Sequence, residues 1–349
     1  MNMYYFFFFL TCMLVWCITA FYKRNKLLYN CSWLFLVTTM ALFAAVRAPG
    51  VDRDYDNYIS WFELIRSNFD IALSQYKDLG FVYTYKIFSL ISSETWGFFL
   101  IISFLSLVWK KKFCETIFKG KYVGLLFILI VSRFYLLHEF TQIRAGLAIA
   151  LSSYGVILYT NGRIKNAYFC FIASSTIHLS VITIPLLLML FYLFKLLRER
   201  VFLLLLPVVG LLAGNISTFL LAHLDLQRIL VYTDSNQVEK ISLLSFYYLS
   251  RITVFYFIVF RLYPYLNKRN ICIVFFAALS LFSNAFFSWN SVISLRIIEV
   301  LGMFDLAMFV IPLLYIKSNG AWIYKVSLFT YSLVLFLSTM KIINPYQTI

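Results

Sequence analysis

The 349-residue chain has few charged residues, and this scarcity excludes most soluble folds. Asp, Glu, Lys and Arg make up 13% of the sequence, whereas 62% is hydrophobic and 20% is aromatic. A soluble domain carries about 25% charged residues. Alternating short strands, the pattern of a membrane β-barrel, are also missing. Hydrophobic runs of about 20 residues, long enough to cross a bilayer as a helix, recur along the whole chain. The composition predicts an all-α, polytopic integral membrane protein.

Motifs for bound cofactors are absent as well. The sequence has no phosphate-binding glycine loop, no GxSxG and no HExxH motif, so nothing indicates ATP or a nicotinamide cofactor. Its six cysteines show neither a CxxC pair nor a Cys/His metal spacing. We therefore expect free thiols, no metal site and no cofactor. The energy for any reaction must come from the substrate or from a gradient.

Acidic residues are scarce, and the resulting charge does not indicate a nucleic-acid partner. The chain has 30 basic and 15 acidic residues, a formal net charge of +15. The basic residues stand in small groups between hydrophobic runs, which is how the positive-inside rule distributes them in membrane proteins. Membrane topology accounts for the charge, so we expect no nucleic acid as partner.

The hydrophobic runs predict about twelve transmembrane helices in a single transmembrane domain, residues 1–349. We see no internal repeat. The first run lacks a basic leader and a small-residue cleavage site, so we interpret it as a retained helix. The predicted spans are 3–22, 27–47, 95–109, 122–138, 143–160, 167–177, 179–194, 201–222, 246–263, 271–290, 297–316 and 323–342.

Basic residues fix the expected orientation. They follow every second span, for example Lys23 and Arg24 after the first and Lys110 to Lys112 after the third. Those loops should face the cytoplasm, which puts both termini and the large loops 48–94 and 223–245 outside. Reading 167–194 as one helix would turn the later basic loops outward. We therefore expect two short helices, or a helix and a re-entrant segment, that meet near His178.

Residues 48–94 form the longest polar segment. After the turn signal Pro49-Gly50, hydrophobic residues recur at helical spacing, and charged residues share the other side. This pattern predicts a helix on the membrane surface, with its aromatic side chains at the headgroup level. The hydrophobic face comprises Tyr55, Tyr58, Phe62, Ile65 and Phe69, and the charged side Arg53, Asp56, Glu63, Arg66 and Asp70. A second such helix follows Gly80.

Arg144 is the first candidate for chemistry. It lies at the predicted outer mouth of span 143–160, whose small residues Gly146, Ala150 and Ser153 permit close helix packing. We expect this helix to be central. An Arg at its outer end suits the capture of an anion, because the planar guanidinium grips phosphate with two hydrogen bonds. The alternative is an interfacial Arg that snorkels toward water.

His178 interrupts a hydrophobic stretch at the suspected helix break. Neutral His accepts a proton at physiological pH, so His178 is a candidate general base. The alternative is a buried His bonded to a neighbouring helix. The first outer loop adds Arg47, Asp52, Arg53 and Asp54, since acids can orient or activate sugar hydroxyls and Arg can bind phosphate. Asp54 has a structural alternative as a helix cap.

Further charges lie in or near the later spans. Arg296 and Glu299 are three residues apart and can pair on one helix face. Asp305 lies deeper in the same span, where a charge is usually partnered or functional. Arg251, near the start of span 246–263, is a further candidate for substrate binding.

In these features the chain resembles the EpsG family of Wzy-type polysaccharide polymerases. Arg47, Gly50-Val51-Asp52 and Asp54 to Tyr58 resemble the family's R…G.D…Y pattern. Ile143-Arg144 and Ile177-His178-Leu179-Ser180 resemble its Arg-Gln and F-H-x-S blocks, although Ala145 stands where Gln is usual. Arg296 with Pro312, and the terminal Pro345-Tyr346, form the third match.

The resemblance implies an enzyme of the bacterial inner membrane with its active site facing the periplasm. Such a glycosyltransferase joins undecaprenyl-diphosphate-linked oligosaccharides into O-antigen, as in lipopolysaccharide, or a related glycan. A chain-length regulator is an expected partner. Arg144, with Arg47 or Arg296, would bind the diphosphate, and His178, Asp52 or Asp54 would activate the acceptor. The alternatives are a flippase for the same lipid-linked units and a glycosyltransferase that uses polyprenyl-phosphate sugars.

Overall fold

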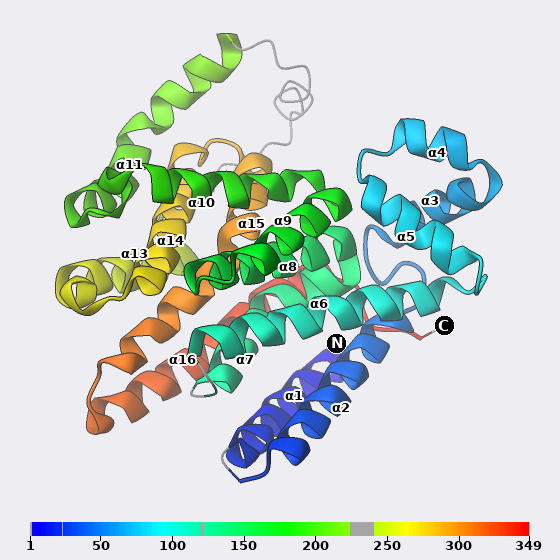
Figure 1. Ribbon diagram of the computed structural model, residues 1–349, viewed down its shortest axis with the longest axis horizontal. Helices are drawn as coiled ribbons and strands as arrows, with labels where there is room; N and C mark the ends of the chain where they lie inside the picture. Colours follow the sequence, from blue (N-terminus) through cyan, green and yellow to red (C-terminus); the bar gives the residue numbers. More distant parts are fainter. Residues whose placement is uncertain (1, 23, 119, 121, 224–240, 349) are drawn as a thin grey trace. The chain divides into compact units, whose positions relative to one another are not determined.

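A computed structural model describes residues 2–22, 24–118, 120, 122–223 and 241–348 (Figure 1). These residues form helices and contain no β-strand, apart from one isolated bridge between Arg47 and Thr348. The predicted all-α membrane fold is confirmed. The predicted outer loop 223–245 falls mostly outside the described residues.

Seven of the described helices are long and apolar enough to cross a membrane. The predicted number of twelve spans is not reached by this criterion and stays a prediction. The spanning candidates are Met3–Phe21, Lys26–Ala45, Val123–Thr141, Ile143–Thr160, Lys268–Phe286, Ser291–Leu314 and Gly320–Ile342, with shorter apolar helices at Leu179–Leu193 and Arg200–Gly214.

The chain packs into two compact units, and the single transmembrane domain stays a prediction. Unit 1 combines Met1–Pro185 with Ser318–Ile349, and unit 2 is Leu186–Lys317. Unit 1 contains α1 (Asn2–Phe21), α2 (Lys26–Ala45), α3 (Tyr55–Ser67), α4 (Phe69–Gln75), α5 (Leu79–Ser89), α6 (Thr95–Phe118), α7 (Val123–Tyr135), the π-helix η1 (Leu136–Thr141), α8 (Ile143–Thr160), α9 (Ile164–Ile177) and α16 (Ser318–Thr339).

Helix α8 is central to unit 1, as its small residues predict. It packs against α6 and α9, and nearly all of its side chains are buried. A Cβ on Gly146 would lie 2.5 Å from His138 Cβ, and one on Gly155 would lie 2.7 Å from the Phe171 ring. Glycine at these positions therefore lets η1 and α9 approach α8 closely.

The predicted membrane-surface helix at 55–69 is α3, but its aromatic face is not on the surface. Tyr55, Tyr58, Phe62 and Ile65 are buried in an aromatic core with residues of α5 and α6. The Phe62 and Tyr85 rings stack with centroids 3.9 Å apart. The expectation of headgroup contact is wrong for α3, because a second helix supplies a protein partner for this face. The charged residues on the other side of α3 are exposed, as expected.

Helix α5 instead presents apolar side chains outward. Leu79, Tyr83 and Ile87 follow one another at helical spacing and are 46%, 49% and 62% exposed. Leu90 and Ile91 continue the apolar surface beyond the helix. The opposite face of α5 is fixed in the aromatic core, so the stripe cannot turn inward. An exposed stripe of this kind is typical of a helix at a membrane surface.

The predicted helix break near His178 is confirmed. Helix α9 ends at Ile177, and His178 has the extended conformation φ −151°, ψ 109°. A short 3-10 helix, η2 (Leu179–Ile182), and then α10 (Thr183–Leu193) follow. The imidazole therefore extends from a helix end rather than from a helix face.

Lys110 does not belong to a loop, contrary to the prediction. Helix α6 continues to Phe118, and Lys110 lies 1% exposed on it. Its Nζ is 2.5 Å from Oε1 of Glu139 in η1, and Ser106 Oγ donates to the same oxygen over 2.8 Å. The prediction failed because Lys110 begins a run of three lysines, which is typical of a loop, and its partner is distant in sequence.

The last described residues lie beside the loop that begins at residue 48. Asn344 N–H donates to Val51 O over 3.0 Å, and the Tyr346 hydroxyl donates to Phe43 O over 2.8 Å. Near the other terminus, the Tyr4 hydroxyl donates to Asn344 O over 3.0 Å. Both termini are therefore on the same side as residues 48–52; that this side faces the periplasm stays a prediction.

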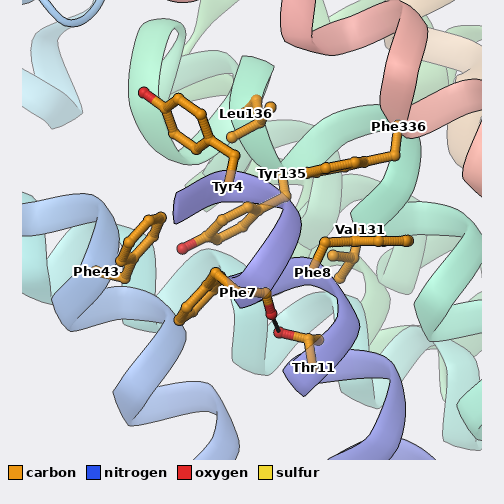
Figure 2. Close-up of a pocket in the computed structure, with 9 residues that line it drawn as sticks. All are labelled: Tyr4, Phe7, Phe8, Thr11, Phe43, Val131, Tyr135, Leu136 and Phe336. Atoms are coloured by element: carbon orange, nitrogen blue, oxygen red, sulfur yellow. Dashed lines mark hydrogen bonds between the residues drawn. The ribbon is translucent and has the colours of Figure 1, made fainter. Parts of the chain in front are cut away.

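Figure 2 shows that aromatic and aliphatic side chains join α1, α2, α7 and α16 around a small pocket. The Phe7 ring stacks on Phe43 at 4.0 Å between centroids, and Phe8 stacks on Phe336 at 4.1 Å. The only hydrogen bond drawn, from Thr11 Oγ1 to Phe7 O, is internal to α1. The lining is too apolar for a charged substrate, and this pocket is part of the scaffold.

Unit 2 contains α11 (Arg200–His223), α13 (Phe246–Phe257), α14 (Lys268–Phe286) and α15 (Ser291–Val310), and a buried ion pair ties three of them together. Arg251 Nη2 of α13 lies 2.8 Å from Asp305 Oδ2 of α15, and both side chains are fully buried. Ser280 of α14 binds both partners, at 2.5 Å to Arg251 and 2.8 Å to Asp305. Asp305 is thus partnered, which is one of the two roles expected for it.

Candidate functional site

One carboxylate brings Arg144 and His178 together. Asp78 Oδ2 forms an ion pair with Arg144 Nη1 and lies 3.2 Å from His178 Nδ1. Asp78 Oδ1 accepts the Leu179 N–H over 3.1 Å. Asp78 is 10% exposed, whereas Arg144 and His178 are each 23% exposed. The cluster is thus partly open to solvent, and the Asp78 carboxylate is its most buried side chain.

Local structure explains how three distant residues meet. Asp78 precedes the first turn of α5, Arg144 lies in the first turn of α8, and His178 follows the last turn of α9. Helix α5 can reach α9 because Gly80 has no side chain: a Cβ there would lie 2.6 Å from Thr176 Oγ1 and 2.8 Å from its carbonyl carbon. The close contact between Gly80 and Thr176 therefore lets Asp78 approach His178.

Aromatic rings surround Arg144. Its guanidinium carbon lies 4.2 Å from the centroid of the Trp61 ring and 5.7 Å from that of Tyr58. Trp61 stacks in turn on Tyr76, with centroids 3.7 Å apart. Such contacts favour a cation and orient the guanidinium plane. Because a guanidinium has five N–H donors and Asp78 uses Nη1, Arg144 retains capacity to bind an anion.

Asp78 is ionised at neutral pH. Burial raises the pKa of its carboxyl, but the hydrogen bond and charge of His178, the Leu179 N–H and the Arg144 charge outweigh burial and lower the pKa below 3.8. A lowered pKa in the folded state means that the contacts of Asp78 stabilise the fold fully above the ordinary pKa. They are lost as the pH falls through the lowered value.

The Asp78 carboxylate also determines which imidazole nitrogen can act. An ionised Asp beside Nδ1 favours the tautomer with a proton on Nδ1, so Nε2 keeps its lone pair. Within the described residues, Nδ1 is the only atom of the His178 side chain with a hydrogen bond. This Asp–His arrangement can take a proton from a hydroxyl, and the resulting imidazolium is stabilised by Asp78.

Arg47 and Asp52 form a second, closed ion pair. Arg47 Nε lies 2.5 Å from Asp52 Oδ2, and neither side chain is exposed. Arg47 also donates to Ala44 O over 2.7 Å and to Phe140 O of η1 over 2.6 Å. Asp52 Oδ1 accepts the N–H of Asp54 over 3.0 Å. These contacts fix residues 47–54 to the end of α2 and to η1.

The remaining predicted site residues differ in their surroundings. Arg53 is exposed, and Asp54 stands at the N-cap of α3 without a side-chain capping bond. In unit 2, Arg251 is buried with Asp305, and Arg296 is exposed on α15.

Sequence reasoning missed Asp78 and Trp61. Asp78 is separated from Arg144 by 66 residues and from His178 by 100 residues, so spacing gives no signal for either contact. The usable signal was local: Asp78 precedes Leu79-Gly80 at the start of an amphipathic helix, in a loop that carries other candidate residues. Trp61 belongs to the same loop and falls outside the buried stripe of α3.

The fold and the cluster define a polytopic membrane protein with an Arg–Asp–His cluster beside one of its large loops. The EpsG family model matches residues 30–348, nearly the whole chain, and the chain belongs to the EpsG family. This membership supports a function as a membrane polysaccharide polymerase in general. Searches of curated proteins and of solved structures find no match.

Replacing Gly80 by Ala is expected to separate Asp78 from His178. The new Cβ would meet the backbone of Thr176, which cannot yield as a flexible side chain would, so α5 must shift. A displacement of about 1 Å at a reacting group can cost up to about 10²-fold in rate. Polymer length in cells and product formation by the purified protein measure the effect.

Gly97→Ala in α6 is the matched control for Gly80→Ala. Its new Cβ would lie 3.1 Å from Phe88 Cζ, the end of a side chain that can move. We expect near-normal polymer from Gly97→Ala. Equal activity of both variants would show that the contact between α5 and α9 does not control the cluster.

Proposed function

We propose that this protein polymerises undecaprenyl-diphosphate-linked oligosaccharides into O-antigen or a related surface glycan at the periplasmic face of the inner membrane. In this proposal it is a glycosyltransferase whose leaving group is a lipid diphosphate. The observation that carries the proposal is the shared Asp78 carboxylate, which joins Arg144 and His178. A cation for the diphosphate and a base for the acceptor hydroxyl therefore stand side by side.

His178 is the proposed general base. Its Nε2 takes the proton of the acceptor hydroxyl as the hydroxyl oxygen attacks the anomeric carbon of the donor. The bond between that carbon and the diphosphate oxygen breaks, and the lipid diphosphate leaves as an anion. Asp78, hydrogen-bonded to Nδ1 at 3.2 Å, orients the ring and stabilises the imidazolium.

Arg144 is the proposed binding group for the departing diphosphate. Its guanidinium can hold two phosphate oxygens at once, and the charge that develops on the leaving group strengthens these bonds in the transition state. The contact with Asp78 and the nearby Trp61 ring hold the guanidinium in position before the substrate binds. Preorganised charges of this kind usually contribute most of the rate enhancement.

The other predicted site residues fall into two groups, buried residues in ion pairs and residues that are at least partly exposed. Arg47, Asp52 and Arg251 are engaged in buried ion pairs, so we assign them to the scaffold. Arg53 and Arg296 are exposed and stay proposed contacts for the oligosaccharide or the second diphosphate. Asp54 stays a proposed contact for sugar hydroxyls. A chain-length regulator stays a proposed partner.

Purified protein in proteoliposomes with a defined lipid-linked repeat unit tests the function. We expect a ladder of products spaced by one repeat unit, with one undecaprenyl diphosphate released per bond formed. A single transfer from a polyprenyl-monophosphate sugar, without a ladder, would favour the alternative glycosyltransferase. Movement of labelled repeat units across the bilayer without any bond formation would favour the flippase.

A gene deletion separates the same possibilities in cells. The proposed polymerase predicts that unpolymerised repeat units accumulate at the outer face of the inner membrane. Accumulation at the inner face would instead indicate that the protein moves the units across.

A further inference from the structure

A large apolar groove lies on unit 1, between α1, α7 and α16. Its volume is about 740 Å³, within the range of about 300–1,000 Å³ that is usual for ligand pockets. Most of its lining side chains are aliphatic or aromatic, and several of them, such as Trp16 and Trp322, are well exposed. Figure 1 shows α7 and α16 side by side. The groove therefore fits a hydrocarbon chain.

Among the described residues that line this groove, Lys325 is the one cation. Lys325 is exposed and lies about two turns into the apolar helix α16. Its Nζ lies 5.4 Å from the centroid of the Tyr122 ring, and among the described residues it makes no ion pair or hydrogen bond. A Lys at membrane depth is costly unless an anion or water meets it, so the position of Lys325 calls for an anionic partner.

The backbone of the groove has an unusual conformation beside Lys325. Tyr122 has φ +65°, and it is the only residue other than Gly with a positive φ in the described chain. This conformation is unfavourable for a bulky side chain and recurs at ligand-binding positions. Two residues further, a Cβ on Gly124 would lie 2.6 Å from Thr19 Cγ2 and 2.7 Å from Val15 Cγ1. Glycine thus lets α7 approach α1 and close the groove's floor.

The groove is separate from the Arg144 cluster. Tyr122 precedes α7, whereas Arg144 follows the far end of the same helix and of η1. The groove also takes in the last turn of α1, after which the exposed Arg24 and Lys26 follow. By the positive-inside rule this end faces the cytoplasmic leaflet, whose anionic lipids complement the positive charge.

We propose that this groove binds an anionic phospholipid of the cytoplasmic leaflet, with its phosphate at Lys325 and one acyl chain along α1, α7 and α16. The Tyr122 and Trp322 rings flank the headgroup, as aromatic residues do at membrane interfaces. The bound lipid holds α16 against α1 and α7. It is a structural lipid of the membrane and not the substrate of the Arg144 cluster.

Native mass spectrometry of the purified full-length protein tests this site. The protein is titrated with phosphatidylglycerol or with phosphatidylethanolamine of the same acyl chains. We expect wild type to prefer phosphatidylglycerol and Lys325→Ala to lose about fivefold in that affinity, the effect of one basic residue near an anionic surface. Lys325→Arg should keep the preference, and Lys317→Ala, an exposed Lys outside the groove, should leave it unchanged.

A second variant tests the acyl chain. Val326→Trp places a bulky ring in the groove, and it should reduce retention of both lipids while helix content and monodispersity stay normal. Equal retention by wild type, Lys325→Ala and Val326→Trp would overturn the site. Displacement of the bound lipid by stoichiometric polyprenyl diphosphate would overturn the choice of occupant. None of these measurements requires polymerase activity, so failure here is distinct from failure of the proposed function.

Discussion

Replacing Arg144 by Ala is expected to lower polymer formation by about 10²–10³-fold, the usual cost of removing one preorganised donor to a developing anion. The guanidinium carries both the charge and the paired N–H donors that a departing diphosphate needs. An ion pair with Asp78 and the Trp61 ring, whose centroid is 4.2 Å from the guanidinium carbon, hold it in place. The rate is measured with purified protein and a lipid-linked repeat unit.

Two further variants separate charge from geometry at this position. Arg144→Lys keeps the charge but loses the fork of donors, so its rate should lie between those of wild type and Ala. Arg163→Ala removes an exposed Arg at the start of α9 and serves as the control for a simple loss of positive charge. Normal chain length from Arg144→Ala at a normal protein level would remove this residue from the mechanism.

Replacing Glu139 by Ala is expected to destabilise unit 1 by about 3–5 kcal/mol, because it leaves the buried Lys110 ammonium without its counter-charge. Glu139 lies in η1, directly before Phe140, whose carbonyl accepts from Arg47, and shortly before the first turn of α8. A change here should therefore also disturb Arg144. Thermal unfolding in detergent, followed by loss of monodisperse protein, measures the stability.

The double variant Lys110→Met with Glu139→Leu decides whether the penalty comes from an unpaired charge. Replacing both partners by apolar groups is often neutral or stabilising, so we expect the double variant to regain most of the stability. The neighbouring Lys111 forms a partly exposed pair with Glu115 at 3.0 Å, and Lys111→Ala should cost only about 0.2–0.5 kcal/mol. A double variant as unstable as Glu139→Ala would show that packing, and not charge, dominates.

Hydrophobicity and small-residue patterns predicted helices well where local sequence and membrane thickness decide the structure. Span 143–160 has the bounds of α8, and its small residues predicted its central position. The break at His178 followed from the balance of charge across the predicted loops. These inferences need only local sequence and the thickness of a membrane, so no knowledge of contacts between helices was required.

The sequence could not predict which residues, far apart in the chain, contact one another. The stripe of α3 is correctly apolar, yet periodicity does not say whether lipid or α5 covers it. Lys110 looks like a loop residue until Glu139 is brought against it. Asp78 gained its role only through contacts made across 66 and 100 residues. Charged residues in a membrane protein are therefore best interpreted in pairs, which a single sequence does not reveal.

The outward stripe of α5 has a consequence for how the protein responds to its surroundings. Leu79, the first residue of the stripe, directly follows Asp78, so the carboxylate moves with the helix. If α5 rests in the outer leaflet, a thinner or thicker hydrocarbon layer will raise or lower it relative to α8 and α9. Acyl-chain length and growth temperature, which alter that thickness, are then expected to tune the turnover rate without any regulatory ligand.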